Sequence, residues 1–315
     1  MIQPYPIETR GLTKKFGGVE ALTALDLRVP RHSIFGFLGP NGAGKSTAIK
    51  LLLGLIRPSG GTGAVAGYDI VHESVELRRK VGYLAQEPRF YEHMTARETL
   101  RFAARLFYTG PAGLIEARVN ESLELTDLAG KADRPVKGFS GGERQRLGIA
   151  QSQINHPELL ILDEPAAALD PLGRRDVLAI MERLREHCTI FYSTHILEDV
   201  QRVSDTVAIL NRGRLLAQAP IEELLAGDGQ AVYTLAVKGD DTEARRAAAG
   251  QPWVLDLTVV PENGHSRWTV RVTSEEAAEA ELLSLVLNTG SVRVAEFSRK
   301  KFSLEEIFVN MVGGN

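Results

Sequence analysis

Residues 39–47 read Gly-Pro-Asn-Gly-Ala-Gly-Lys-Ser-Thr, which matches the phosphate-binding loop pattern G-x-x-x-x-G-K-[ST]. Glycines allow backbone N–H groups to turn towards phosphate oxygens where a Cβ atom would clash. An apolar run over 33–38 precedes the loop and a helical aliphatic pattern over 48–53 follows it, so the sequence predicts a strand, the loop and a helix. The residues predicted to bind a nucleoside triphosphate are Gly39, Pro40, Asn41, Gly42, Ala43, Gly44, Lys45, Ser46 and Thr47.

Two side chains of this loop have chemical roles that follow from the pattern. Lys45 is long enough to reach the β- and γ-phosphates, and the Ser46 hydroxyl can bind Mg²⁺. The helix predicted to begin near Gly44 directs its positive end at the same phosphates. The loop therefore predicts a bound triphosphate with its magnesium ion, without indicating what the hydrolysis drives.

A second motif, residues 159–165, reads Leu-Leu-Ile-Leu-Asp-Glu-Pro and joins an aliphatic strand to two carboxylates. Four aliphatic residues in a row are typical of a central parallel strand that is covered on both faces. Asp163 ends this strand, where its carboxylate can hold Mg²⁺ through the water shell of the ion. Glu164 comes one residue later and points elsewhere, so we predict that it acts on an attacking water.

A third motif, residues 139–146, reads Phe-Ser-Gly-Gly-Glu-Arg-Gln-Arg and leads into a helix predicted over 144–151. The start of this helix is a second place suited to an anion, because its first N–H groups have no partners within the helix. One nucleotide does not need two such sites in a single subunit. This third motif is therefore the most specific indication of the kind of ATPase involved.

The three motifs together resemble those of the ABC (ATP-binding cassette) ATPases, and the resemblance covers about residues 5–225. Further positions follow in the order and spacing of that family. Each alone would be uninformative, because a single Phe, Gln or His is more often structural. The matching positions are Phe16 for the aromatic residue that stacks on adenine, Gln86 for the Q-loop, Asp170 for the D-loop and His195 for the switch histidine.

The resemblance implies how these residues would act together. In this family ATP lies between two subunits packed head to tail, and the third motif of one subunit closes the site of the other. Glu164 would polarise the attacking water, His195 would contact the γ-phosphate, and Gln86 would join the loop serine as a Mg²⁺ ligand. Lys45 would take part in catalysis as well as binding. The residues that would bind ATP in the facing subunit are Ser140, Gly141 and Gly142.

Three positions depart from the commonest form of the family. The third motif begins with Phe139 and has Glu143 after the glycines, where Leu and Gln are commonest. The Ser-Gly-Gly core is intact, so we expect little effect. Ala167 stands in the D-loop where the family usually has Ser, which removes a hydroxyl able to hydrogen-bond across a dimer interface or near the attacking water. This change bears on coupling between subunits more than on hydrolysis.

The chain is long enough for one large or two modest domains. We predict an α/β P-loop ATPase domain over 1–226, with a mixed sheet, an antiparallel β subdomain and a helical subdomain at about 88–138. Residues 227–230 are predicted to be a linker. A smaller α+β domain over 231–315 has the predicted order β-α-β-β-α-β followed by a helix, which suggests a ferredoxin-like fold.

The composition argues against several classes of protein. The net charge is −3 and the isoelectric point is about 6.2, whereas nucleic-acid-binding domains commonly lie above about 9. The single cysteine, Cys188, cannot form a disulfide within the chain and indicates a reducing cytosol. No secretion signal is visible, and the longest aliphatic runs fall short of the ~20 residues that span a bilayer. A transporter built on this chain would need another chain for its pore.

Three functions are compatible with these observations. We rank first a cytosolic ATPase subunit at the cytoplasmic face of the membrane, working with a separate polytopic membrane subunit and a second ATPase subunit, expected to be another copy of this chain. Residues 303–308 resemble the C-terminus of ABC-2-type exporter ATPases, which favours export. The alternatives are an importer ATPase with a regulatory C-terminal domain and a soluble ABC ATPase that acts on ribosomes or DNA. The one phosphate loop and the acidic composition make the soluble role the weakest.

Overall fold

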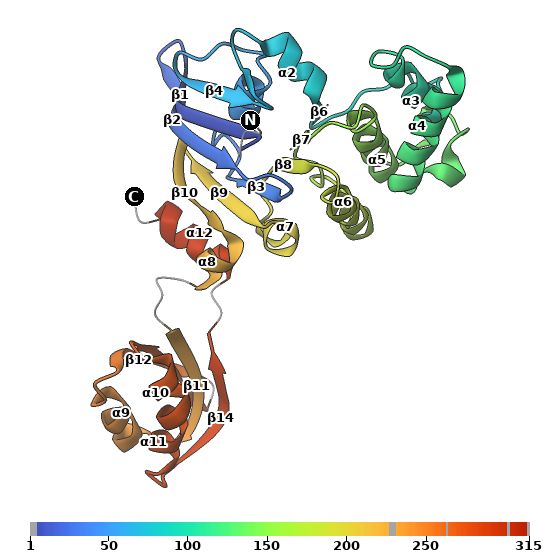
Figure 1. Ribbon diagram of the computed structural model, residues 1–315. Coiled ribbons are helices and arrows are strands. Elements are labelled where there is room, and N and C mark those ends of the chain that lie inside the picture. The colour runs from blue at the N-terminus through green and yellow to red at the C-terminus, as the bar shows by residue number, and fades with distance from the viewer. Residues whose placement is uncertain (1–4, 227–230, 263, 301–302, 314–315) are drawn as a thin grey trace. The chain divides into compact units, whose positions relative to one another are not determined.

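A computed structural model describes residues 5–226, 231–262, 264–300 and 303–313 (Figure 1). The chain divides into two compact units, Met1–Ile221 and Glu222–Asn315. This division falls a little before the boundary predicted at residue 226, and the predicted linker, 227–230, lies outside the described residues.

The first unit is built around a mixed sheet in which five neighbouring strands run parallel and one edge strand is antiparallel. The strands β3 and β7 are buried throughout, as the aliphatic run at 159–162 predicts. Because the carboxyl ends of parallel strands meet at one edge, the sheet brings the ends of β3, β7 and β8 together. In spatial order the strands are β10 (Arg214–Pro220), β9 (Thr206–Asn211), β3 (Ile34–Leu38), β8 (Thr189–Thr194), β7 (Leu159–Asp163) and β6 (Val81–Leu84).

An antiparallel sheet packs against this mixed sheet through a shared apolar core. Leu22 and Leu25, both on strand β2 of this antiparallel sheet, belong to the same buried cluster as Phe35 and Phe37 of β3. The predicted antiparallel β subdomain is thereby confirmed. In spatial order its strands are β2 (Val19–Val29), β1 (Ile7–Phe16), β4 (Gly60–Val65) and β5 (Tyr68–Asp69). The other helices of the first unit are α1 (Lys45–Leu52), α2 (Ser74–Lys80), α6 (Pro171–Leu184) and α7 (Leu197–Val203). Helix α8 (Ile221–Ala226) begins at the division between the two units.

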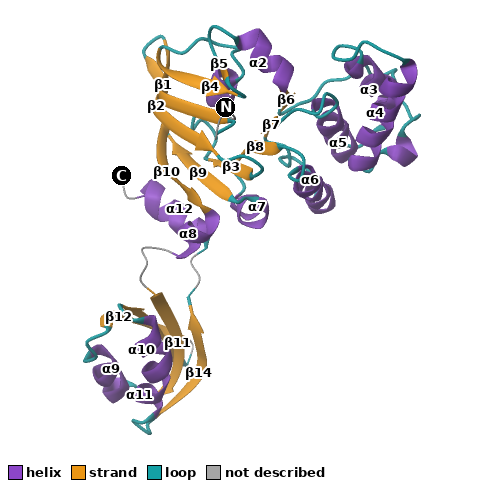
Figure 2. Ribbon diagram, viewed as in Figure 1, coloured by secondary structure: helices purple, strands orange, loops and turns teal. Residues whose placement is uncertain are grey.

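The predicted helical subdomain has an apolar core of its own, to which Leu100, Val119 and Leu147 contribute (Figure 2). Its first helix begins as the sequence indicates, with a capping box between Thr95 and Glu98. The elements within the predicted range are α3 (Ala96–Ala104), α4 (Ala112–Leu125) and the 3₁₀ turns η1 (Ala129–Lys131) and η2 (Val136–Gly138). Helix α5 (Gly141–Ser152) lies beyond the predicted end at about residue 138, but it contributes to the same core.

Helix α5 begins earlier than the sequence predicts. We expected the helix from residue 144, but Gly141 and Gly142 already form its first turn and Ser140 is its N-cap. The reason is a capping box, in which the Ser140 side chain accepts a hydrogen bond from the Glu143 amide and the Glu143 side chain accepts one from the Ser140 amide. These two bonds offset the low helix propensity of glycine.

The far end of α5 lies close to strand β6. A Cβ atom added to Gly82 of β6 would lie 2.0 Å from the carbonyl oxygen of Ser152, so only glycine permits this approach. Gly148 of α5 also lies close to β6, since its Cβ atom would lie 2.5 Å from the end of the Leu84 side chain, although that side chain could shift. The helix that carries the Ser-Gly-Gly motif is therefore held directly against the edge of the mixed sheet.

The second unit contains a fully antiparallel four-stranded sheet with the spatial order β12-β13-β11-β14. Trp268 and Leu235 lie in its buried core. The predicted order of strands and helices is confirmed, although the second helix includes a π-helical turn that no sequence pattern indicated. The ferredoxin-like assignment stays a prediction. The elements are β11 (Ala231–Gly239), α9 (Thr242–Ala249), β12 (Val254–Glu262), β13 (His265–Val272), α10 (Glu275–Ala277), the π turn η3 (Ala278–Leu282), α11 (Leu283–Leu287), β14 (Val292–Arg299) and α12 (Leu304–Gly313).

Candidate nucleotide site

The predicted phosphate-binding loop joins β3 to α1, with Gly44 as the N-cap of the helix. Gly44 has φ 106°, a backbone angle that residues with a side chain rarely adopt. A Cβ atom at this position would also lie 2.5 Å from the carbonyl oxygen of Ala21, so the close contact excludes a side chain as well. The loop is held by the turn between β9 and β10, because the Gly213 amide donates a 2.8 Å hydrogen bond to the Ala43 carbonyl. The glycine backbone and this hydrogen bond fix the shape of the loop, and a loop fixed in shape lowers the cost of binding.

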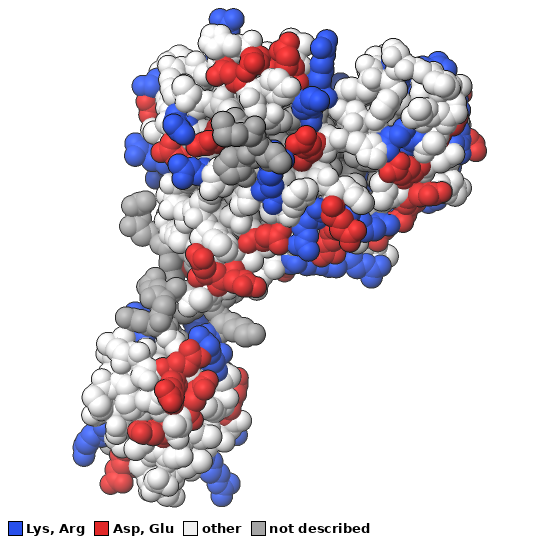
Figure 3. All heavy atoms as spheres, in the orientation of Figure 1, with Lys and Arg blue, Asp and Glu red and all other residues white. Residues whose placement is uncertain are grey.

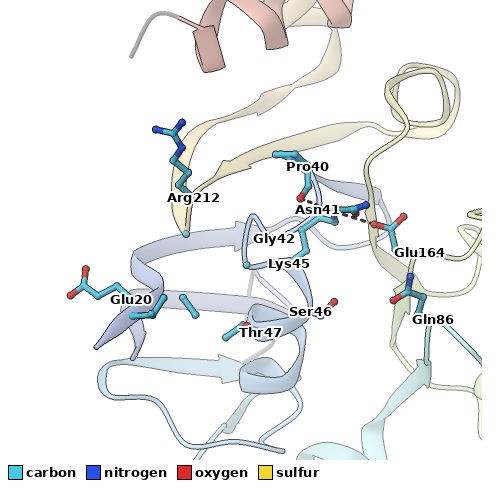
Figure 4. A pocket seen from close by; sticks show the side chains of 14 residues that line it. Glu20, Pro40, Asn41, Gly42, Lys45, Ser46, Thr47, Gln86, Glu164 and Arg212 are labelled. Atoms are coloured by element: carbon cyan, nitrogen blue, oxygen red, sulfur yellow. Dashed lines mark hydrogen bonds and ion pairs between the residues drawn. The ribbon is translucent and has the colours of Figure 1, made fainter. Parts of the chain in front are cut away.

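The loop forms one wall of a pocket of about 450 Å³ (Figure 4). Ser46, Gln86 and Glu164 gather on one side of this pocket, and Glu20 and Arg212 lie away from them (Figure 4). The phosphate loop, the Q-loop residue Gln86 and Glu164 of the second motif, which are predicted to act on one nucleotide from within this subunit, therefore meet in space. The lining residues are Val19, Glu20, Ala21, Pro40, Asn41, Gly42, Gly44, Lys45, Ser46, Thr47, Gln86, Glu164, Arg212 and Gly213.

Glu164 stands at the centre of the charged part of the site. One oxygen of its carboxylate lies 3.1 Å from Lys45 Nζ and the other lies 2.9 Å from His195 Nδ1. The Lys45 ammonium is only 6% exposed and also donates to the Gly39 carbonyl at 2.6 Å. Two groups predicted to contact the γ-phosphate thus converge on the carboxylate predicted to activate water.

Ser193 is a residue of this site that the sequence analysis did not single out. Its hydroxyl donates to Asp163 at 2.5 Å and accepts a 3.0 Å hydrogen bond from the Glu164 amide. Glu164 has φ 51°, a left-handed conformation that is uncommon for a residue with a side chain. Ser193 therefore holds the carboxylate of Asp163 and the backbone of Glu164. The only signal for it is the register of β8 beside β7, in which Asp163 lies opposite Ser193.

The oxygen ligands predicted for Mg²⁺ suit that ion. A hydroxyl from Ser46, an amide from Gln86 and a carboxylate from Asp163 are hard donors of the kind magnesium prefers. Within the described residues, no group of three or more His, Cys, Asp or Glu side chains is placed to hold a metal. Magnesium bound beside a triphosphate usually takes its remaining ligands from phosphates and water.

Several predicted residues lie outside the pocket lining. Gly39, Ala43, Asp163 and His195 are absent from this lining. The carbonyls of Gly39 and Ala43 and the ring of His195 nevertheless contact the lining residues Lys45, Gly213 and Glu164. Phe16 is 50% exposed and its ring faces the Lys14 ammonium at 4.9 Å, so its role in stacking on adenine stays a prediction. The Ser140 group at the start of α5 is also absent from the lining of this pocket.

Sequence reasoning missed the part of the lining that comes from Glu20 and Arg212. Glu20 lies on β2 and Arg212 in the turn between β9 and β10, both remote in sequence from the loop. The side chain of Glu20 pairs with Lys15 and accepts a hydrogen bond from Thr23, which lower the pKa of its carboxyl. The one available signal was the Asn-Arg-Gly hairpin turn, which indicates a turn without indicating what it faces.

A buried ion pair connects the two helices that follow the D-loop and the switch histidine. Arg174 of α6 lies 2.5 Å from Asp199 and 3.1 Å from Glu198, both on α7. Burial raises the pKa of the Asp199 carboxyl, and Arg174 opposes this effect. Asp199 is 1% exposed, and its second oxygen has no hydrogen-bond partner. Its charge is therefore compensated mainly by Arg174.

Replacing Arg174 by Ala should destabilise the protein by about 3–5 kcal/mol, because the variant leaves an unpaired buried carboxylate. The free energy of unfolding, measured by urea denaturation at neutral pH, tests this. Arg175→Ala is the matched control, since that side chain is exposed and pairs with Asp176 at 3.9 Å. Its removal should change stability by less than about 0.5 kcal/mol. Equal losses in the two variants would contradict the assignment.

Comparison with known proteins agrees with this site. Residues 22–167 match the family described as ABC transporter. The bacitracin transport ATP-binding protein BcrA of Bacillus licheniformis is 34% identical over 310 residues, which cover 98% of this chain and 97% of that protein. The daunorubicin/doxorubicin resistance ATP-binding protein DrrA of Streptomyces peucetius is 34% identical over 314 residues, covering 98% of this chain and 92% of that protein.

Solved structures give the same result over most of the chain. The cbiO1 subunit of the cbiONQ transporter complex of Clostridium perfringens matches with a TM-score of 0.67 and 27% identity, covering 71% of this chain and 92% of that one. A structure described as the ATP-binding subunit of an ABC transporter matches with a TM-score of 0.63 and 31% identity, covering 71% and 93%. The chain is a member of the ABC transporter ATP-binding proteins and an ATPase of that family.

Proposed function

We propose that this chain is the ATPase subunit of an exporter, which hydrolyses ATP between two head-to-tail subunits and drives transport through a separate membrane subunit. One observation carries the proposal. Helix α5 begins at Gly141 with Ser140 as its N-cap, and such a helix start is suited to an anion, yet these residues do not line the pocket made by the phosphate loop of their own subunit. A facing subunit, expected to be a second copy, gives this site a phosphate to bind.

The chemistry proposed for the assembled site uses the contacts described above. Lys45 and His195 would transfer from the Glu164 carboxylate to the γ-phosphate, which leaves Glu164 free to orient and polarise the attacking water. Ser46 and Gln86, with Asp163 behind them, would hold Mg²⁺, which neutralises phosphate charge when bound. The proposal also includes the division of the chain into an ATPase domain over 1–226 and an accessory domain over 231–315.

The surface proposed to receive the membrane subunit is a groove of about 310 Å³ between β6 and α3. Leu106 and Phe107, in the turn that follows α3, line the groove and are exposed apolar side chains. Phe102 is exposed on α3 itself. Exposed apolar groups of this kind indicate a partner surface. In the described residues no helix is long and apolar enough to cross a membrane, so we place the chain peripherally at the cytoplasmic face.

The direction of transport is inferred from relatives. Two of them are described as acting in bacitracin transport and in daunorubicin/doxorubicin resistance, and both are similar over nearly the whole chain. Resistance to a toxic compound is consistent with its removal from the cell. Nucleic acid is not proposed as a partner, because Lys and Arg are interspersed with Asp and Glu over the face in Figure 3.

The function is tested by affinity purification of the tagged chain from membranes of the native cell in mild detergent. We expect a polytopic membrane protein to co-purify, and its sequence would narrow the substrate. Recovery with an extracellular solute-binding protein would favour import instead. Recovery of ribosomes or nucleic acid, or of no membrane protein, would contradict the transport function.

Leu106→Glu should abolish recovery of the membrane subunit, because it places a charge in the proposed groove. ATP binding by the purified variant should be unchanged within about twofold, since the change lies outside the nucleotide pocket. Leu55→Glu is the matched control: Leu55 is exposed, but it is not among the residues that line this groove. If both variants keep the membrane subunit, the groove has been assigned wrongly.

A further inference from the structure

Glu143, which replaces the commoner Gln, is buried at the start of α5 and is only 7% exposed. Its two carboxylate oxygens have different partners. One accepts a 2.8 Å hydrogen bond from the Ser140 amide, which completes the capping box. The other forms an ion pair with Lys131 of η1. Lys131 therefore contacts the side chain that fixes the backbone of Ser140.

The charge of Glu143 needs compensation if Ser140 faces a triphosphate. A glutamine here would be neutral and would still accept the hydrogen bond from the Ser140 amide. A glutamate keeps that bond but adds a negative charge close to the place where a γ-phosphate would bind, and like charges repel. The repulsion falls when a cation pairs with the carboxylate.

We propose that Lys131 is a positioning residue for the anion site that Ser140, Gly141 and Gly142 form at the start of α5. Lys131 holds the Glu143 side chain in the capping box and compensates its negative charge, which would otherwise repel the ATP of the facing subunit. This inference rests on the proposed function, because it concerns a nucleotide shared between subunits. The role proposed for Lys131 explains how the start of α5 can bind an anion although the motif contains a glutamate.

The surroundings of Glu143 support this role. Burial by itself would raise the pKa of the Glu143 carboxyl, but the hydrogen bonds from Lys131 and Ser140 outweigh burial, so the pKa lies below its usual range. Arg134 also lowers this pKa through its charge, although its guanidinium donates to the Gly138 carbonyl. Lys131 is the cation in direct contact with the carboxylate.

The first test measures ATP-dependent dimerisation by sedimentation, in a Glu164→Gln background that prevents hydrolysis. Lys131→Ala should raise the dimer dissociation constant by about tenfold, because Glu143 loses its counter-charge. The same change made together with Glu143→Gln should have an effect of less than about twofold, because no charge is left to cancel. Lys131→Arg, which keeps the positive charge, should dimerise as the parent does.

Lys137→Ala is the matched control, since it removes an exposed positive charge from the adjoining turn η2. A small effect of Lys137→Ala beside a large effect of Lys131→Ala supports a specific pair. If Lys131→Ala had the same effect whether Glu143 is kept or changed by Glu143→Gln, the proposal would be overturned, as it would be by no effect in either background.

A second measurement separates this inference from the proposed dimer. The carboxyl ¹³C resonance of Glu143, assigned by its loss in Glu143→Gln, is titrated in the full chain without ATP. Lys131→Ala should raise the titration midpoint by about one pH unit, since an opposite charge in contact shifts a carboxyl by that order. If the parent fails to dimerise, the self-pairing proposal fails, and the titration then decides the role of Lys131. An unchanged midpoint would overturn it.

Discussion

Glu164→Gln should lower the rate of ATP hydrolysis by about 10²–10⁴-fold while ATP still binds. The amide has nearly the shape of the carboxylate but carries no negative charge, so it cannot polarise a water molecule or accept a proton from it. Its loss leaves Lys45, Ser46 and the loop backbone in place to hold the phosphates. The variant should therefore accumulate as an ATP-bound dimer, which steady-state hydrolysis and sedimentation with ATP would reveal together.

Glu158→Gln provides the control for this experiment. Glu158 is exposed and immediately precedes β7, the strand that ends at Asp163, so the same chemical change is made outside the site. Hydrolysis should stay within about twofold of the parent. If Glu164→Gln hydrolysed ATP as fast as the parent, Glu164 could not be the residue that activates water.

Lys45→Ala should weaken ATP binding by about 30- to 1000-fold, which corresponds to about 2–4 kcal/mol. The ammonium is buried, and the loop carbonyls of Gly39 and Pro40 fix it at 2.6 and 3.3 Å, so no flexible surface lysine can replace it. The loss should appear as a higher dissociation constant for ATP in equilibrium dialysis. Hydrolysis should fall as well, because the same group is proposed to stabilise charge on the γ-phosphate.

Lys50→Ala is the matched control for Lys45→Ala. Lys50 lies on the same helix, α1, but is exposed in its last turn. Its removal should change ATP affinity by less than about twofold, because an exposed charge at the far end of the helix is screened. Similar weakening by both changes would mean that the net charge of the helix, rather than the contact made by Lys45, governs binding.

The sequence predicted those parts of the site in which local backbone chemistry and residue type coincide. The phosphate loop needs glycine at Gly44 for its backbone angle and close approach, and β7 needs apolar side chains because it is buried on both faces. Such requirements leave a pattern in a short stretch of sequence. Gln86 has no local signal, and its position followed only from the spacing of a known family.

Ser193, Glu20 and Arg212 were missed because they reach the site through tertiary structure. Ser193 depends on the register of β8 beside β7, and Arg212 depends on which loop the β9–β10 turn packs against. A serine in a strand or an arginine in a turn carries no information about such pairing. The start of α5 was predicted at residue 144, three residues beyond its actual start at Gly141, for a related reason. Glycine is a poor helix former, but the reciprocal hydrogen bonds of the Ser140 capping box outweigh that preference.

The left-handed backbone of Glu164 has a consequence for how this protein can change. A glycine would relieve a strain of roughly 1–3 kcal/mol there, so the residue proposed for catalysis is a poor choice for stability alone. Heat resistance and hydrolysis therefore make opposite demands on one position.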